Sequence, residues 1–283
     1  FVVLVTDAEQ RNLRFSTELS ATDGSGAGPL SWRVLEPMTT WRLVLGSNPT
    51  GLEFDVTWHA RAPAWVGDID VANDGDASTS FEHLFQSGYY DGTLRIDGQQ
   101  HDVTGWYGQR DRSRGVRTMS GGQGLHIWYQ AQFPDFSIGF LLVETRQHDT
   151  MLLQGAVMHE NGELDPITGV RHDLSFSEDL DLMSGTVEIT TENGVTYAVD
   201  ADASAGGGYM AGAGYGGHHG TPRGRDHIEH DSYPLDGSVS PRTLDSALTD
   251  RLATFDWDGT PGRGIVEFAL TRSRSYTYQP TLR

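Results

Sequence analysis

The sequence predicts an all-β protein, and three of its features indicate this. Short runs alternate apolar and polar residues with the period of a half-buried strand, most clearly over Leu52–Trp58. The dipeptides Asn161-Gly162 and Asn193-Gly194 separate such runs, and Asn-Gly is the strongest short signal for a hairpin. The 7 Trp and 10 Tyr residues favour packed β structure. Strands at short spacing joined by polar turns are typical of a sandwich or a barrel.

In chain order, alternation predicts strands in the N-terminal part of the chain at Leu13–Leu19, Trp32–Glu36, Trp41–Leu45 and Leu52–Trp58. The run Phe81–Gln86 fits either one helical turn or an edge strand, and a hairpin is expected over residues 92–104. Further strands are predicted at Leu125–Phe133, Phe136–Glu144, Met151–Met158, within 185–199, and at Ile265–Arg272. A single modest helix is expected over Leu244–Leu252.

The repeated hairpins suggest two related β domains, which we place at residues 1–86 and 87–283. The chain length of 283 residues allows one large domain or two smaller ones. Because Phe1 is not a start methionine and Phe1–Val5 reads as a strand, we expect the first domain to lack its first strands. The glycine-rich stretch 205–220, within a Gly/His-rich loop over 205–231, is expected to be a mobile surface loop or a lid over a cavity.

Composition excludes several kinds of function. The net charge is −19, which should repel nucleic acid and anionic membranes. No cysteine is present, so disulfides and cysteine metal sites are excluded. The chain contains no lysine, so a phosphate-binding loop lysine and Schiff-base chemistry are excluded. No apolar run approaches the roughly 18 residues of a membrane span, and we expect a cytoplasmic protein.

The segment Gly105–Arg117 is the main candidate for chemistry. It holds four arginines around one carboxylate, that of Asp111, which Arg110 and Arg112 flank. Strand alternation would point Asp111 to one face and both arginines to the other. If Asp111 is buried away from the guanidiniums it becomes a neutral proton donor, and beside them it stays ionised. The alternative is a surface turn with ordinary Arg–Asp pairing.

The pattern of this segment resembles a signature of a superfamily of tandem lipocalin-like proteins, which includes the carotenoid 1,2-hydratases and the AttH-like proteins. The residues in register are Gly108, Arg110, Asp111, Ser113, Gly115 and Arg117. The chain departs from the pattern at Arg112, where relatives have His, and at Arg114, where they have Trp. The resemblance implies two lipocalin-like (calycin-type) antiparallel β-barrels or half-barrels packed together around an apolar cavity. It also implies that Asp111 protonates an alkene.

The resulting hypothesis is a cofactor-independent enzyme acting on an isoprenoid-like molecule (terpenoid, carotenoid or steroid-like) by hydration, dehydration or cyclisation. Its expected catalytic residues are Asp111, Arg110, Arg112 and Glu267. The residues expected to bind substrate are Trp106, Tyr107, Arg117 and Trp128. Alternation places Glu267 opposite its two apolar neighbours, so it points either into a cavity or outward.

Two other functions stay open. The first is a non-catalytic carrier of a hydrophobic ligand, in which Asp111 is only the centre of ion pairs. The second is a metal-dependent enzyme using the histidine-rich loop, with His218, His219, His227 and His230 as ligands. A glycine tract does not project ligands rigidly to one point, so we expect no metal site and no cofactor.

Overall fold

The chain divides into two compact units. The computed structural model describes residues 1–16, 25–72, 78–116, 122–217, 221, 223, 224 and 226–282. Unit 1 consists of Phe1–Arg61, Gly88–Gly108 and Gly208–Ser246, and unit 2 consists of Ala62–Ser87, Gln109–Gly207 and Ala247–Arg283. The units are thus interleaved in sequence, unlike the contiguous division 1–86 and 87–283. The reason is that strands β8 (Ser78–Ile96) and β10 (Trp106–Val116) contribute residues to both units.

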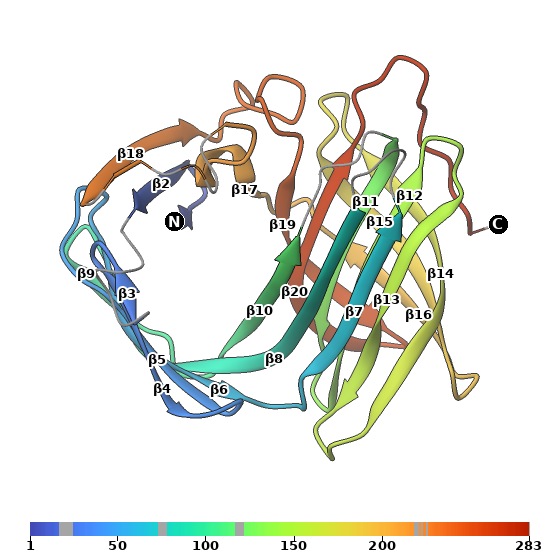
Figure 1. The fold of residues 1–283 in the computed structure, drawn as a ribbon, viewed down its shortest axis with the longest axis horizontal. Helices are drawn as coiled ribbons and strands as arrows, with labels where there is room; N and C mark the ends of the chain where they lie inside the picture. Colours follow the sequence, from blue (N-terminus) through green and yellow to red (C-terminus); the bar gives the residue numbers. More distant parts are fainter. Residues whose placement is uncertain are drawn as a thin grey trace. The chain divides into compact units, whose positions relative to one another are not determined.

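Unit 2 is built on a closed antiparallel barrel of eight strands, so the all-β prediction is confirmed (Figure 1). The strand order is β16-β15-β14-β13-β12-β11-β20-β19, and pairing of β16 with β19 closes it. The predicted strands Leu125–Phe133 and Phe136–Glu144 are present as the hairpin of β11 and β12, and the two Asn-Gly turns join β13 to β14 and β15 to β16. The barrel strands are β11 (Gln123–Gln132), β12 (Phe136–Thr145), β13 (Thr150–His159), β14 (Leu164–Phe176), β15 (Leu182–Thr191), β16 (Thr196–Asp202), β19 (Thr249–Trp257) and β20 (Thr260–Leu270).

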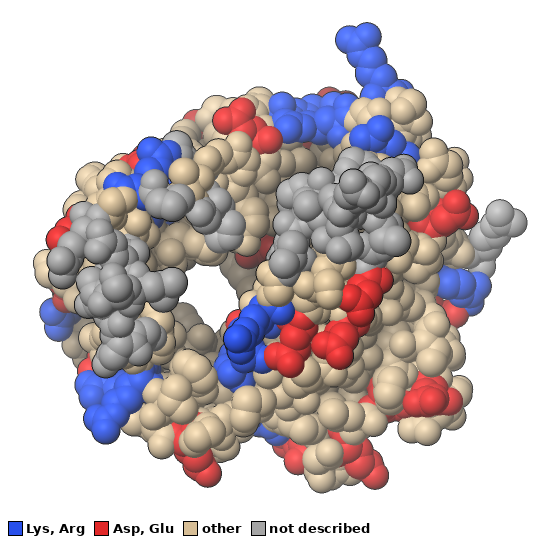
Figure 2. All heavy atoms as spheres, in the orientation of Figure 1, with Lys and Arg blue, Asp and Glu red and all other residues tan. Residues whose placement is uncertain are grey.

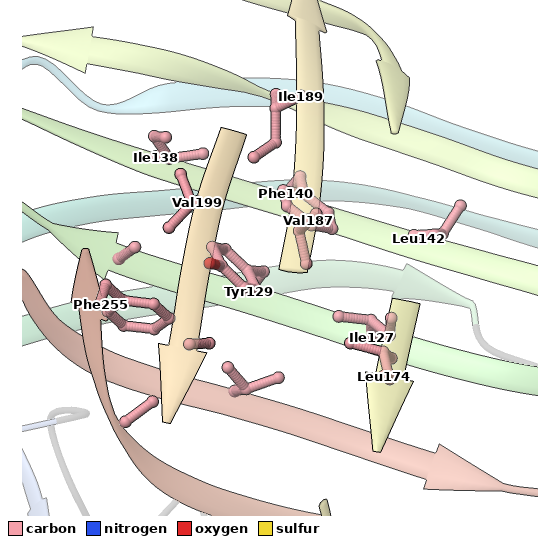
Figure 3. Close-up of a cluster of buried hydrophobic side chains, with 14 of the residues drawn as sticks. Ile127, Tyr129, Ile138, Phe140, Leu142, Leu174, Val187, Ile189, Val199 and Phe255 are labelled. Carbon is pink, nitrogen blue, oxygen red and sulfur yellow. The ribbon is translucent and has the colours of Figure 1, made fainter. Parts of the chain in front are cut away.

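Apolar side chains fill the interior of this barrel. Tyr129 stacks on Phe140 with ring centroids 4.9 Å apart, and Phe255 tilts against Tyr129 at 5.1 Å. Figure 3 shows these rings among the aliphatic side chains of the facing strands, including Ile138 and Val199. Such packing is typical of small barrels, whose interior is just wide enough for side chains. The apolar chamber expected from the sequence is therefore not the interior of this barrel.

A second layer covers part of the outer face of the barrel within unit 2. Strand β7 (Trp65–Ala72) pairs with the first half of β8. Alternate residues of β12 belong to different clusters: Phe140 points into the barrel, whereas Leu141 packs outside it with Ile69 and Phe81. Both faces of β12 are thus buried, which explains why its sequence is almost continuously apolar.

The C-terminal segment of the chain is fixed to strand β14. The backbone N–H groups of Thr281 and Leu282 donate to the carbonyl oxygen of His172, and the His172 N–H donates to Thr281 Oγ1. Three residues before Thr281, the hydroxyl of Tyr278 accepts a hydrogen bond from the backbone N–H of Leu174 at 2.8 Å.

Unit 1 consists of open antiparallel sheets in its described part. Strands β1 (Val2–Val5), β2 (Glu9–Ser16) and β18 (His227–Pro234) form one sheet. Leu13, Leu45 and Leu52 pack together as a core between strands of both sheets. The second sheet contains β3 (Gly26–Ala27), β4 (Leu30–Glu36), β5 (Thr40–Leu45), β6 (Leu52–Ala60), residues 88–96 of β8, and β9 (Gln99–Asp102).

Two expectations about elements are wrong. Residues 244–248 are not helical, and Thr249–Leu252 begin strand β19. Three leucines at a spacing of four imitate a helix face there, but pairing of Thr249–Leu252 with β20 decides the structure. The predicted mobile glycine loop is partly ordered, as β17 (Gly207–Tyr209) and a 3₁₀ turn η2 (Met210–Ala213). A Cβ on Gly207 would lie 2.0 Å from the Asp250 carbonyl, so only glycine allows this approach.

On the face shown in Figure 2, acidic and basic side chains are scattered among uncharged ones, so the net charge of −19 does not form one continuous acidic field there.

In the described parts of the chain, no helix has the length and apolar character needed to cross a bilayer.

Candidate functional site

The aspartate of the arginine-rich segment pairs with a histidine from the neighbouring strand β8. In unit 2, Asp111 Oδ1 lies 2.7 Å from Nε2 of His83. The imidazole is buried, with 4% of its side chain exposed, whereas the Asp111 side chain is 44% exposed. The expectation of a buried acid at position 111 is therefore wrong. The carboxylate is open to solvent on one side and fixed by a buried imidazole on the other.

Aromatic rings surround the imidazole of His83. The edges of Trp65 and Phe85 meet it at 6.5 and 5.6 Å between ring centroids, and Phe81 tilts against it at 5.9 Å. Its Nδ1 atom is buried without a hydrogen-bond partner among the described residues. A second N–H on this ring would be a buried donor without an acceptor, which is costly. The neutral ring with its proton on Nε2, donated to Asp111, therefore fits the site best.

The two arginines beside Asp111 point away from it, as strand alternation predicts. Arg110 Nη1 donates to Gln86 Oε1 at 3.2 Å, and Arg112 forms an ion pair with Glu82. Glu82 and Gln86 alternate with His83 along β8, so the arginines and the aspartate use opposite faces. The pKa of Arg110 is lowered mainly by burial and secondly by the nearby charge of Arg112. The partners Gln86 and Glu82 thus hold the two arginines on the face of the strand opposite to Asp111.

A second group of titratable residues lies on the outer face of the barrel. Asp250 and Glu267 are directly opposite each other in the β19–β20 pair. Glu267 Oε1 lies 3.1 Å from Nε2 of His126. Burial is the main cause that raises the pKa of Asp250 well above its usual range, and the charge and hydrogen bond of Glu267 add to it. Two carboxyls this close are most stable when they hold one proton between them.

Aromatic side chains connect the two groups within unit 2. Trp128 lies directly opposite Glu267 in the β11–β20 pair. It packs in the same outer cluster as Phe81, whose ring contacts that of His83. The indole Nε1 of Trp128 is buried without a partner among the described residues. The pairs Asp111–His83 and Asp250–Glu267 therefore belong to one outer face of the barrel.

The remaining predicted substrate-binding residues are placed differently. Trp106 and Tyr107 belong to unit 1 and are 54% and 42% exposed. The guanidinium of Arg61 lies 5.1 Å from the centre of the Tyr107 ring, so a cation already covers that face. Arg117 lies outside the described residues. Trp128 is the one predicted aromatic that the structure places with Glu267.

A third cluster is buried inside the barrel. His172 Nε2 lies 3.1 Å from Glu144 Oε1, and its Nδ1 lies 2.9 Å from the Tyr278 hydroxyl. His172 is fully buried and Glu144 is 4% exposed. This cluster is enclosed by the core and the C-terminal segment, so we assign it a structural role.

The histidine-rich region does not present a metal site in its described part. His227 Nε2 lies 3.4 Å from Glu229 Oε2, and His230 is paired with Leu13 across β18 and β2. His218 and His219 lie outside the described residues. Across the described ranges, no group of three His, Asp or Glu side chains is arranged to hold a metal ion.

Sequence reasoning missed three of these residues. His83 lies in the run Phe81–Gln86, for which the sequence fits either one helical turn or an edge strand. In a strand, His83 shares a face with Phe81 and Phe85, and this spacing of two was the signal that could have placed it among aromatic rings. His126 lies within the predicted strand Leu125–Phe133, and its neighbours in the sequence give no sign of a partner. Asp250 lies within Leu244–Leu252, which the sequence predicts to be helical. Only the pairing of β19 with β20 places it opposite Glu267.

Comparison with known proteins supports the fold. The family model described as "Domain of unknown function (DUF7064)" matches residues 3–218. A structure described as an AttH candidate (NE1406) from Nitrosomonas europaea has a TM-score of 0.55 at 14% identity, covering 85% of this chain and 68% of its own. Kievitone hydratase from Nectria haematococca has a TM-score of 0.51 at 13% identity, covering 95% of this chain and 82% of its own. No curated protein sequence matches the chain.

Proposed function

The chain belongs to the DUF7064 family, and we propose that it is an enzyme that adds water to, or removes it from, a hydrophobic small molecule by general acid–base chemistry. The observation that carries this proposal is the 2.7 Å contact between the exposed carboxylate of Asp111 and the buried imidazole of His83. A carboxylate held on one side and open on the other is positioned to exchange a proton with water or substrate.

In this proposal Asp111 acts as the general base during hydration. Its Oδ1 accepts the N–H of His83, so Oδ2 is left to accept a proton from the attacking water. His83 is a positioning residue, because the aromatic rings around it fix the imidazole and the imidazole fixes the carboxylate. During dehydration the same carboxyl returns the proton to the leaving hydroxyl. This role as a base differs from that of the proton donor expected from the sequence.

Two further observations support the class of reaction. The fold resembles that of kievitone hydratase, which makes water addition the first reaction to test. Trp65 and Trp128 lie in apolar clusters on the outer face of the barrel near His83, which favours a hydrophobic substrate such as an isoprenoid. The filled barrel interior disfavours a carrier that encloses its ligand there.

The proposal can be tested by incubating the protein with kievitone and with linalool in ¹⁸O-labelled water. We expect a product that carries one labelled oxygen, detected by mass spectrometry, with at least one of these probes. Asp111→Asn should reduce the rate by about 10²–10⁴-fold, the usual contribution of a general base. The matched control is Asp102→Asn, because Asp102 is an exposed carboxylate whose partner among the described residues is Thr104.

The control separates a catalytic effect from a change of surface charge, since both variants remove one negative charge. Equal rates for Asp111→Asn and the wild type would show that Asp111 is not the base. Absence of label in every product of the wild type would refute water addition to these probes.

A further inference from the structure

The acid that complements the Asp111 base can be located on the same face of the barrel. We propose that Asp250 and Glu267 hold one proton between them and, with His126, form the proton-donating site for the substrate. This inference rests on the function proposed above, because addition of water to a double bond needs an acid as well as a base.

The register of the barrel brings the two carboxyls together. Asp250 on β19 and Glu267 on β20 are directly paired across an antiparallel ladder, so their side chains leave the same face at close range. Oδ1 of Asp250 is buried and has no donor among the described residues. A buried carboxylate without a donor is costly, and a proton shared with Glu267 removes that cost.

The glycine stretch before β17 covers the backbone on one side of Asp250. The carbonyl of Gly206 accepts the N–H of Leu252, and Gly207 approaches the Asp250 backbone so closely that any Cβ would collide with it. Arg251 points to the opposite face and donates to the Ala203 carbonyl, so it does not neutralise Asp250. Asp250 is thus kept as the neutral member of the pair.

The other members of the group connect the shared proton to solvent and to substrate. The side chains of His126 and Glu267 are 23% and 19% exposed, so the pair can exchange protons with water. Trp128, opposite Glu267, supplies an aromatic face beside the acid. An indole face stabilises a developing carbocation by cation–π attraction.

The proposed reaction is balanced. The shared proton passes to one alkene carbon, the π electrons form the new C–H bond, and the neighbouring carbon becomes cationic. A lone pair of water then forms the C–O bond, and the proton that water loses passes to the Asp111 carboxylate. Exchange with solvent at Asp111 and at the His126–Glu267 pair restores the starting protonation, so the net change is addition of water.

Infrared spectroscopy of the purified protein at pH 7 tests the shared proton without any substrate. We expect the carbonyl stretch of a neutral carboxylic acid in the wild type and its loss in Asp250→Asn. The matched control is Asp55→Asn, because its hydrogen bond with Arg42 lowers the pKa of Asp55 and keeps that carboxyl ionised. The absence of a neutral carboxyl band, or a band that Asp250→Asn leaves unchanged, would overturn the proposal.

The ¹⁸O assay tests the catalytic role. Asp250→Asn should lower the rate of hydration by about 10²–10⁴-fold, with little effect from Asp55→Asn. An unchanged rate in Asp250→Asn would overturn that role even if the band is present. If the wild type labels neither probe, the function proposed above fails, while the infrared result still decides whether Asp250 and Glu267 share a proton.

Discussion

Replacing Tyr278 by Phe should destabilise unit 2, because the hydroxyl completes a buried polar network. The Tyr278 hydroxyl accepts the N–H of Leu174 at 2.8 Å and therefore has its own proton free for Nδ1 of His172 at 2.9 Å. The other ring nitrogen of His172 then carries the proton that is donated to Glu144 at 3.1 Å. These bonds fit a His172 ring with its proton on Nε2, while Oε2 of Glu144 is buried without a partner among the described residues.

The magnitude follows from the groups that the substitution leaves unpaired. Phe keeps the ring and its packing, so the loss is confined to the hydroxyl. The N–H of Leu174 and the Nδ1 atom of His172 would each lose a partner in a buried setting, at about 1–3 kcal/mol each. We therefore expect Tyr278→Phe to lower the free energy of unfolding of unit 2 by about 2–6 kcal/mol.

Tyr276→Phe provides a matched control two residues away. The Tyr276 hydroxyl is buried but has no hydrogen-bond partner among the described residues, so its removal should cost less than about 0.5 kcal/mol or even stabilise unit 2. Urea unfolding followed by tryptophan fluorescence reports on unit 2 through Trp65, Trp128 and Trp257. Equal losses of stability in the two variants would refute the role assigned to the Tyr278 hydroxyl.

Two further predictions concern stability. Because burial raises the pKa of Asp250, the folded chain retains a proton that the unfolded chain releases above about pH 4, so wild-type stability falls as pH rises. The free energy of unfolding in urea should therefore be higher for Asp250→Asn than for the wild type at pH 8, and the two values should converge near pH 4. The same difference in free energy at both pH values would contradict this. Gly139→Ala should cost about 1–3 kcal/mol, since its Cβ would lie 2.5 Å from the Phe85 ring, whereas Gly169→Ala meets nothing closer than 3.8 Å and should be nearly neutral in the same assay.

Local pattern was sufficient for much of the β structure. The hairpin of β11 and β12 follows the alternation and the Pro134–Asp135 turn, and both Asn-Gly turns lie where the sequence places them. Alternation also separated Asp111 from Arg110 and Arg112 correctly. These features depend on neighbours within a few residues, so a single sequence contains the information they need.

The candidate site was predicted less completely. The sequence singled out Asp111 and Glu267 but did not identify the residues that pair with them. The partner of Asp111 is 28 residues away on β8, and Asp250 is 17 residues before Glu267 on a strand that looked helical. Burial was also misjudged, since the pKa that burial raises is that of Asp250, whereas the Asp111 side chain is 44% exposed.

The sequence alone determined that this chain is all-β and where several of its hairpin turns lie. It also identified Asp111 and Glu267 as candidate functional residues. Only the tertiary structure decided that a closed barrel fills its own interior and that the pairs Asp111–His83 and Asp250–Glu267 lie on its outer face. The physical reason is that alternation fixes which residues share a face of one strand, whereas the register between distant strands fixes which residues meet. Burial, which sets the protonation of a carboxyl, depends on that register.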